Sequence, residues 1–169
     1  EFEIAVQRME EPGADGADDV EFLISTNPGE SLKPLGRIAS GGELSRVMLA
    51  IKTVLADQDA IETVIFDEID TGISGRTAQK VSEKLALIGR SRQVICITHL
   101  AQLASMADSH YCIEKRAVDG STQTGIRLLD EQESVEELAR ILGGAQITDA
   151  VIDNAREMKK LAQKFKERA

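Results

Sequence analysis

Apolar residues along this chain occur either at steps of three or four residues or in short continuous runs, and these two patterns predict its secondary structure. Residues 41–56 carry apolar side chains every three or four positions, which predicts a helix with one buried face. That face comprises Leu44, Val47, Met48, Ile51, Val54 and Leu55. Residues 76–89 show the same period, with Gly89 as a stop signal. The buried stripe expected there comprises Ala78, Val81, Leu85 and Ile88.

Two short runs, 62–67 and 93–98, are almost uniformly apolar and too short for surface helices. Each predicts a strand buried on both faces, as strands of parallel sheets are. A strand, a helix and a second strand at this spacing form a crossover unit, so the two strands should lie parallel. A short helix over 99–107 is expected next. The fold class is therefore α/β, with a mainly parallel sheet flanked by helices.

Further strands are predicted on either side of this unit. Residues 1–9 and 20–26 are expected to be two strands joined by a loose, acidic linker that contains Pro and Gly. Residues 109–115 and 122–129 are expected to form a hairpin around a turn at 118–121.

The remaining segments are a loop and two closing helices. Residues 27–38 begin with an Asn-Pro-Gly-Glu turn and are expected to form a loop. The first helix should begin with a capping box at Ser134–Glu137 and end at the glycines 143–144. The second spans 148–168, and its predicted buried residues are Val151, Ala155, Met158, Ala162 and Phe165.

Length and composition limit the kinds of protein this can be. A chain of 169 residues, 42% hydrophobic, can bury a core and fits one domain or one large lobe of a domain. Its apolar runs fall short of the ~20 residues that cross a bilayer, and its Glu-Phe-Glu-Ile start is typical of an internal cut point rather than a secretory leader. We therefore expect a soluble protein. Cys96 and Cys112 lack metal-ligand spacing, which favours buried free thiols in a reducing cytoplasm over a disulfide or metal site.

Charge is distributed unevenly along the chain. A net charge of −9 argues against a general nucleic-acid binder, because phosphate backbones repel an acidic surface. Residues 1–21 are strongly acidic, whereas the last helix is basic. We interpret its cations as a solvated helix face in preference to a DNA contact. They are Arg156, Lys159, Lys160, Lys164, Lys166 and Arg168.

The start of the first helix, Ser40-Gly41-Gly42-Glu43, is a candidate anion site. Ser40 and Glu43 alone would suffice for ordinary helix capping. Two glycines in the first turn cost about 1 kcal/mol each relative to alanine, so capping does not explain them. They would allow a phosphate or another backbone to approach the unpaired amides and the positive end of the helix dipole. We favour phosphate recognition, with capping as the alternative.

Asp67 and Glu68 follow the first apolar strand, at the carboxyl edge where open α/β sheets bind ligands. One acid can hold Mg²⁺, usually through water, and the other can orient or deprotonate a water that attacks a terminal phosphate. The alternative is a pair of acids that solvates the strand end. His99 closes the next strand at the same edge and could donate to a γ-phosphate or simply begin a helix. We interpret His110 as structural.

Taken in order, these residues resemble the ABC-type ATPase heads of the SMC-like family, and specifically its bacterial DNA-repair members. Residues 39–46 resemble the signature motif, with Glu43 where transporters usually carry Gln. Residues 64–68 resemble the Walker B strand with its catalytic glutamate, and 97–102 the switch-histidine segment. Further similar segments are 27–30, 33–35, 48–52, 70–75 (the D-loop) and 141–144.

The resemblance implies an ATPase in which two heads form a homodimer around two ATP molecules, with Mg²⁺ as cofactor. The implied site residues are Ser40, Gly41, Gly42 and Glu43 for the γ-phosphate of ATP held by the second head, Asp67 for Mg²⁺ through water, and Glu68 and His99 for catalysis. It also implies DNA double-strand-break repair and recombination, contact with DNA ends, a nucleoid-associated place in the bacterial cytoplasm, and no membrane.

Two departures from the family pattern matter. Ser74 stands at the D-loop position where an Asp is typical, and no Gly-x-x-x-x-Gly-Lys-[Ser/Thr] loop (Walker A) occurs. Residues 1–169 would then be the C-terminal lobe of a head, with 1–26 the return from a coiled-coil arm. We expect this chain alone to lack ATPase activity.

Alternatives are another SMC-like or transporter-like ATPase, and a non-hydrolysing dimerisation module. Residues 43–46 argue against a transporter, and the presence of both Asp67 and Glu68 argues against loss of hydrolysis.

Overall fold

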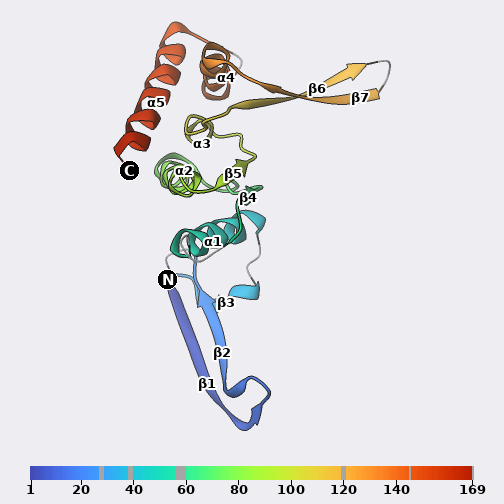
Figure 1. Ribbon diagram of the computed structural model, residues 1–169, viewed down its shortest axis with the longest axis vertical. Helices are drawn as coiled ribbons and strands as arrows, with labels where there is room; N and C mark the ends of the chain where they lie inside the picture. The colour runs from blue at the N-terminus through green and yellow to red at the C-terminus, as the bar shows by residue number, and fades with distance from the viewer. Residues whose placement is uncertain (27–28, 38–39, 56–59, 119–120, 145, 169) are drawn as a thin grey trace.

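A parallel pair of strands lies at the centre of the chain (Figure 1). The computed structural model describes residues 1–26, 29–37, 40–55, 60–118, 121–144 and 146–168, with the backbone alone for 116–118. β4 (Thr63–Phe66) pairs in parallel with β5 (Gln93–Cys96), and α2 (Gly75–Gly89) connects them. This confirms the predicted crossover unit and the α/β class.

One face of this pair is covered and the other is open. α2 buries the predicted stripe (Ala78, Val81, Leu85 and Ile88) in a cluster that also includes Phe66 and Ile69. The opposite face carries Ile65, which is 65% exposed, with Ile95 and Ile97 also exposed. The expectation of strands buried on both faces is therefore wrong for β4 and β5, because no described element of this chain covers that second face.

α1 (Gly41–Val54) begins where the sequence predicts, and Ser40 is its N-cap. Its predicted end at Ala56 lies outside the described residues. The predicted buried face is wrong for this chain: Leu49 is buried instead, and Val54 is 83% exposed. Other members of that apolar face that are exposed are Leu44, Met48, Ile51 and Leu55. Apolar periodicity indicates that one face of a helix is buried in the complete assembly. No described element of this chain buries that face of α1.

The N-terminal hairpin is longer than predicted. β1 (Phe2–Gly13) and β2 (Gly16–Ile24) pair antiparallel from Phe2 opposite Ile24 to Arg8 opposite Asp18, and after a shift in register Gly13 lies opposite Gly16. The segment expected to be a loose linker is therefore mostly strand, because a ribbon exposed on both sides tolerates acidic residues. The expected loop over 27–38 contains a third strand, β3 (Lys33–Pro34), and a 3₁₀ turn, η1 (Leu35–Arg37), while residues 27–28 and 38 lie outside the described residues.

The C-terminal part consists of α3 (Ala101–Ala104), the hairpin β6 (Tyr111–Val118) and β7 (Ser121–Leu128), and two packed helices, α4 (Glu131–Gly143) and α5 (Asp149–Arg168). α3 is shorter than the expected 99–107. The hairpin is confirmed, although residues 119–120 of its turn lie outside the described residues. Among the described helices, none combines the length and hydrophobicity needed to span a bilayer.

The N-cap of α4 differs from the prediction. Asp130 is the N-cap, and its carboxylate and Glu133 form the capping box. Ser134 lies within the first turn, buried, with its hydroxyl 2.8 Å from Nδ1 of His110. His110 lies directly before β6, and burial lowers the pKa of its ring. Both cysteines are free thiols, as predicted, and are half-buried.

Candidate active site

Three segments that are distant in sequence meet at one edge of the parallel pair. They are the first turn of α1, the loop over 67–71 that follows β4, and residues 98–100 that follow β5. β4 and β5 end at the same edge because they are parallel, and α1 runs back so that its N-terminus reaches the loop. The sequence-predicted site residues are therefore brought together, apart from residue 39 of the signature segment, which lies outside the described residues.

Ser40 caps α1 through two contacts with Glu43. The amide of Glu43 donates to Ser40 Oγ (3.2 Å), and the Ser40 hydroxyl donates to Glu43 Oε2 (3.0 Å). Thr26 donates to the other oxygen, Oε1 (2.8 Å). These hydrogen bonds, that of Thr26 first, lower the pKa of Glu43 and favour its charged form. The capping contacts use the amides of Glu43 and Leu44, so those of Gly41 and Gly42 are the first-turn donors to consider for an anion.

The two glycines allow the chain's own loop to approach α1. A Cβ on Gly42 would lie 2.9 Å from the Glu68 carbonyl oxygen and 3.0 Å from Thr71 Cβ. On Gly41 it would lie 2.6 Å from Glu68 Oε2. The sequence argument attributed both glycines to an approaching ligand, and it missed this packing within the chain.

Side chains of α1 hold the loop that carries the two acids. Ser45 donates to the carbonyl of Asp67 (2.9 Å), and Arg46 donates to the carbonyls of Ile69 (3.2 Å) and Thr71 (2.8 Å). Ile69 is fully buried and anchors the loop in the core. Both acids are thereby kept at the exposed edge of the sheet, within reach of a ligand.

Glu68 has an unusual backbone conformation. Its φ of 56° lies in the left-handed region, which is unfavourable for a residue with a side chain. Its amide donates to Oδ1 of Asp67 (2.9 Å), so the two acids are linked at the turn. Strained residues persist where surrounding contacts hold them, and they are frequent at catalytic sites.

His99 is held by an acid that the sequence analysis left without a role. Nδ1 of His99 lies 3.0 Å from Oδ2 of Asp70. The same oxygen accepts the Thr98 hydroxyl (2.6 Å) and the His99 amide (2.9 Å). Asp70 follows β4 at the edge where His99 follows β5, so the parallel-strand argument could have paired them.

Asp67 suits a magnesium ion that binds mainly to a nucleotide. Among the described residues no group of three or more His, Cys, Asp or Glu side chains forms a metal site. Mg²⁺ bound to a nucleotide commonly uses one or two carboxylates, several waters and the phosphates. One exposed carboxylate at the strand end is compatible with that arrangement, so Asp67 fits as a ligand, directly or through water.

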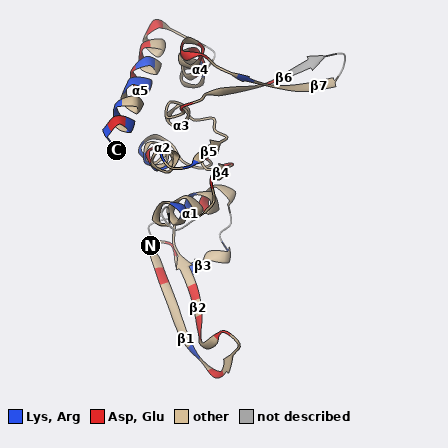
Figure 2. Ribbon diagram, viewed as in Figure 1, with Lys and Arg blue, Asp and Glu red and all other residues tan. Residues whose placement is uncertain are grey.

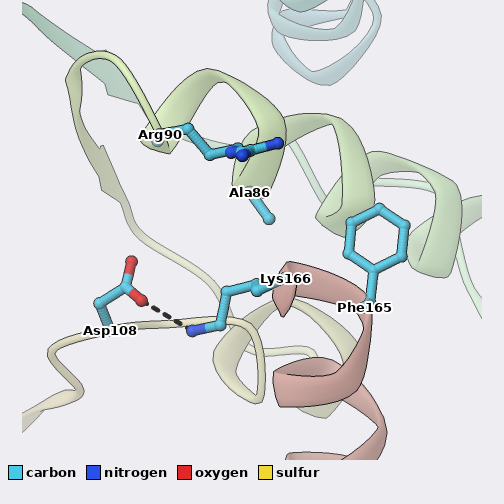
Figure 3. A pocket seen from close by; sticks show the side chains of 6 residues that line it. Ala86, Arg90, Asp108, Phe165 and Lys166 are labelled. Carbon is cyan, nitrogen blue, oxygen red and sulfur yellow. Dashed lines mark hydrogen bonds and ion pairs between the residues drawn. The ribbon is translucent and has the colours of Figure 1, made fainter. Parts of the chain in front are cut away.

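Two hollows lie away from this edge. A cavity of about 330 Å³ lies between α2 and α5. At its edge Nζ of Lys166 forms an ion pair with Oδ1 of Asp108 (2.7 Å; Figure 3). A wider groove of about 750 Å³ runs along α5, lined by Lys159, Lys160 and Lys164 but also by Asp130 and Glu131. Figure 2 shows the contrast between acidic β1–β2 and the cations of α5. The acids opposite those cations agree with a solvated helix face.

The chain is similar in sequence to bacterial proteins that carry the name DNA repair protein RecN. It is 50% identical over 151 residues to DNA repair protein RecN of Halalkalibacterium halodurans, covering 89% of this chain and 27% of that protein. It is also 50% identical over 151 residues to RecN of Bacillus subtilis, covering 89% of this chain and 26% of that protein. The chain thus spans about a quarter of these relatives' length. No family model matches the chain.

A solved structure supports the fold. The crystal structure of an Smc head domain with a coiled coil and joint from Pyrococcus yayanosii matches with a TM-score of 0.55 at 22% sequence identity. The match covers 81% of this chain and 25% of that one. Together with the mixed α/β architecture, it shows that this chain has the fold of part of an Smc head domain.

Proposed function

We propose that this chain, which is similar to RecN proteins, is a part of their SMC-like, ABC-type ATPase head and supplies half of a nucleotide clamp formed by two heads. The chain would be the C-terminal lobe, covering residues 1–169, with 1–26 returning from a coiled-coil arm. The observation that carries the proposal is the convergence of the α1 N-terminus, the acids after β4 and His99 after β5 at one sheet edge.

The first turn of α1 would bind the γ-phosphate of ATP held by the partner head. The capping contacts use the amides of Glu43 and Leu44, so those of Gly41 and Gly42 would be the donors once the Glu68 side chain turns away from Gly41. The helix dipole favours negative charge there. Ser40 would exchange its bond to Glu43 for one to the phosphate. The Glu43 carboxylate would then lie near a phosphate of the same charge. The hydrogen bond that it accepts from Thr26 would help to keep it turned away from the phosphate.

The acids after β4 would act on ATP bound to their own head. Asp67, which is exposed at the end of β4, would hold Mg²⁺. The charge that Mg²⁺ supplies would offset the negative charge of the phosphates. Glu68 would turn from Gly41 toward the attacking water, orient it and accept its proton. His99 would contact the γ-phosphate and respond to its loss.

Hydrolysis would remove the ligand shared by the two heads and so shift the population from dimer toward separate heads. We further propose that the full-length protein is a homodimer of the bacterial cytoplasm that acts on DNA ends in double-strand-break repair and recombination. This rests on the names of the relatives, RecN DNA repair proteins.

The proposal is tested with Glu68→Gln in the full-length protein. We expect ATP binding to persist and turnover to fall by about a hundredfold or more, because the general base is lost. The ATP-linked dimer should then persist, as measured by light scattering. Glu157→Gln, a matched change on the exposed face of α5, should behave as wild type. Normal turnover by Glu68→Gln would refute the role.

Two alternatives give different results in that experiment. A non-hydrolysing dimerisation module would show the same dimer lifetime in wild type and Glu68→Gln. Another SMC-like ATPase head would behave as proposed here, and it would differ in the sequence outside this chain. A Walker A loop followed by a long heptad-patterned arm supports the RecN type.

A further inference from the structure

Asp70 is a buried acid whose carboxylate binds both the backbone and the ring of His99. Its side chain is 3% exposed, whereas that of His99 is 73% exposed. Oδ2 of Asp70 accepts the Thr98 hydroxyl and the His99 amide, and these two bonds already tie the loop over 67–71 to the end of β5. The third contact, from Nδ1 of His99, involves a ring that adds little to the core. It therefore orients the ring more than it stabilises the fold.

This contact determines where the ring carries its proton. A carboxylate oxygen can only accept, so Nδ1 of His99 must carry the hydrogen that joins it to Asp70. In the neutral ring Nε2 then has a lone pair and no hydrogen. A phosphate oxygen is also an acceptor, so Nε2 can meet it only when the ring is doubly protonated. The positive charge of that form would lie next to the Asp70 carboxylate, because Nδ1 is 3.0 Å from Oδ2.

We propose that Asp70 is the positioning residue for His99: it fixes the ring through Nδ1, presents Nε2 outward, and balances the charge that the ring carries when it contacts a terminal phosphate. The inference rests on the proposed function, in which His99 meets the γ-phosphate. It adds a residue to that site and defines the chemical form in which His99 acts. The arrangement parallels other carboxylate–histidine pairs, in which the acid sets the tautomer and orientation of the ring.

A double-mutant cycle in the full-length protein tests the proposal. Asp70→Asn keeps the size of the side chain and an acceptor oxygen but removes the charge. We expect kcat for ATP to fall by about tenfold, as when the orienting partner of a functional histidine is lost, with KM changed less. In a His99→Ala background the same change should have no further effect, because Asp70 acts through the ring.

Thr98→Val is the matched control. It removes another donor to the same Asp70 oxygen and leaves the ring contact in place. If Asp70 only ties the loop to β5, then Thr98→Val should lower kcat as Asp70→Asn does, and Asp70→Asn should remain harmful in the His99→Ala background. Either result, or an unchanged kcat in Asp70→Asn, overturns the inference. Thermal unfolding of each variant checks that it is folded.

A spectroscopic measurement separates this inference from the proposed function. In full-length protein with ¹⁵N-labelled histidine, the ring signal that disappears in His99→Ala should report the Nδ1-protonated tautomer. A neutral ring that carries its hydrogen on Nε2 and none on Nδ1 overturns the positioning role even if the protein hydrolyses ATP. If wild type hydrolyses no ATP, the proposed function fails, and the ring signal still decides whether Asp70 positions His99.

Discussion

Gly41 and Glu68 lie in contact across the site, so that a Cβ at position 41 would be 2.6 Å from Oε2 of Glu68. The proposed general base therefore rests on the helix start that is proposed to bind the partner's phosphate. Gly42 differs, because its Cβ would meet the backbone oxygen of Glu68 at 2.9 Å. A side chain can rotate away, whereas a backbone held by Arg46 and Ser45 cannot.

Alanine substitutions at the two glycines should therefore differ in stability. Gly42→Ala should lower the free energy of unfolding by about 1–3 kcal/mol, the usual cost of overpacking. Gly41→Ala should leave it unchanged or raise it by up to about 1 kcal/mol, because Glu68 can turn aside and alanine favours the helix. Urea unfolding of a head that joins this chain to the proposed Walker A lobe measures both.

The control for these variants is Gly89→Ala at the end of α2, where no atom lies within 4 Å of the added Cβ. It should not be destabilising. Equal losses for Gly41→Ala and Gly42→Ala would contradict the packing described for the loop over 67–71.

Cys96 should resist alkylation in the folded protein. Burial, with smaller contributions from the charges of Asp70 and Asp67, raises the pKa of its thiol from 9.0 to about 12. Because the thiolate is the reactive form, iodoacetamide at pH 8 should label Cys96 far more slowly than in urea-unfolded protein, as measured by mass spectrometry of its peptide. Equal labelling in the two states would show that the thiol is accessible and ionises normally.

The same thiol gives a pH dependence of stability. As the pH rises above 9, the unfolded chain releases the Cys96 proton while the folded chain retains it until about pH 12. The folded state then binds more protons, so stability falls as the pH rises through this window. Cys96→Ala should reduce that fall relative to wild type. A parallel fall in both proteins would exclude Cys96 as a cause.

The chain by itself should show no measurable ATPase activity. It contains the carboxylates after β4 but no Walker A loop to hold the β-phosphate. A colorimetric phosphate assay of the chain, with the reconstituted head as positive control, checks this. Robust hydrolysis by the chain would overturn the assignment of the missing parts.

Sequence patterns predicted the elements whose contacts lie within this chain. The stripe of α2 is buried as its period indicates, because β4, β5 and α3 supply the facing residues. The apolar face of α1 and Ile65 were predicted to be buried and are exposed. Periodicity identifies an apolar face, but it does not show whether the same chain covers that face. The contact between Asp70 and His99 was missed, although parallel β4 and β5 place both residues at one sheet edge.

Two local errors have a chemical cause. The acidic residues between the first two predicted strands indicate a loop by composition, yet a ribbon exposed on both sides accommodates them within strands. At α4 two overlapping cap signals compete, and Asp130 with Glu133 forms the capping box while Ser134 bonds His110 inside the first turn. Which residue caps the helix therefore depends on the contacts that each candidate side chain makes in the folded chain.

The most direct test of the proposed clamp is ATP-dependent dimerisation of a head that joins this chain to the proposed Walker A lobe, comparing wild type with Ser40→Arg by light scattering. If the α1 N-terminus contacts the partner's nucleotide, Ser40→Arg should bind ATP as wild type does and remain monomeric, because a long cation replaces the hydroxyl at the interface. A mutant that binds ATP and still dimerises would contradict the central claim.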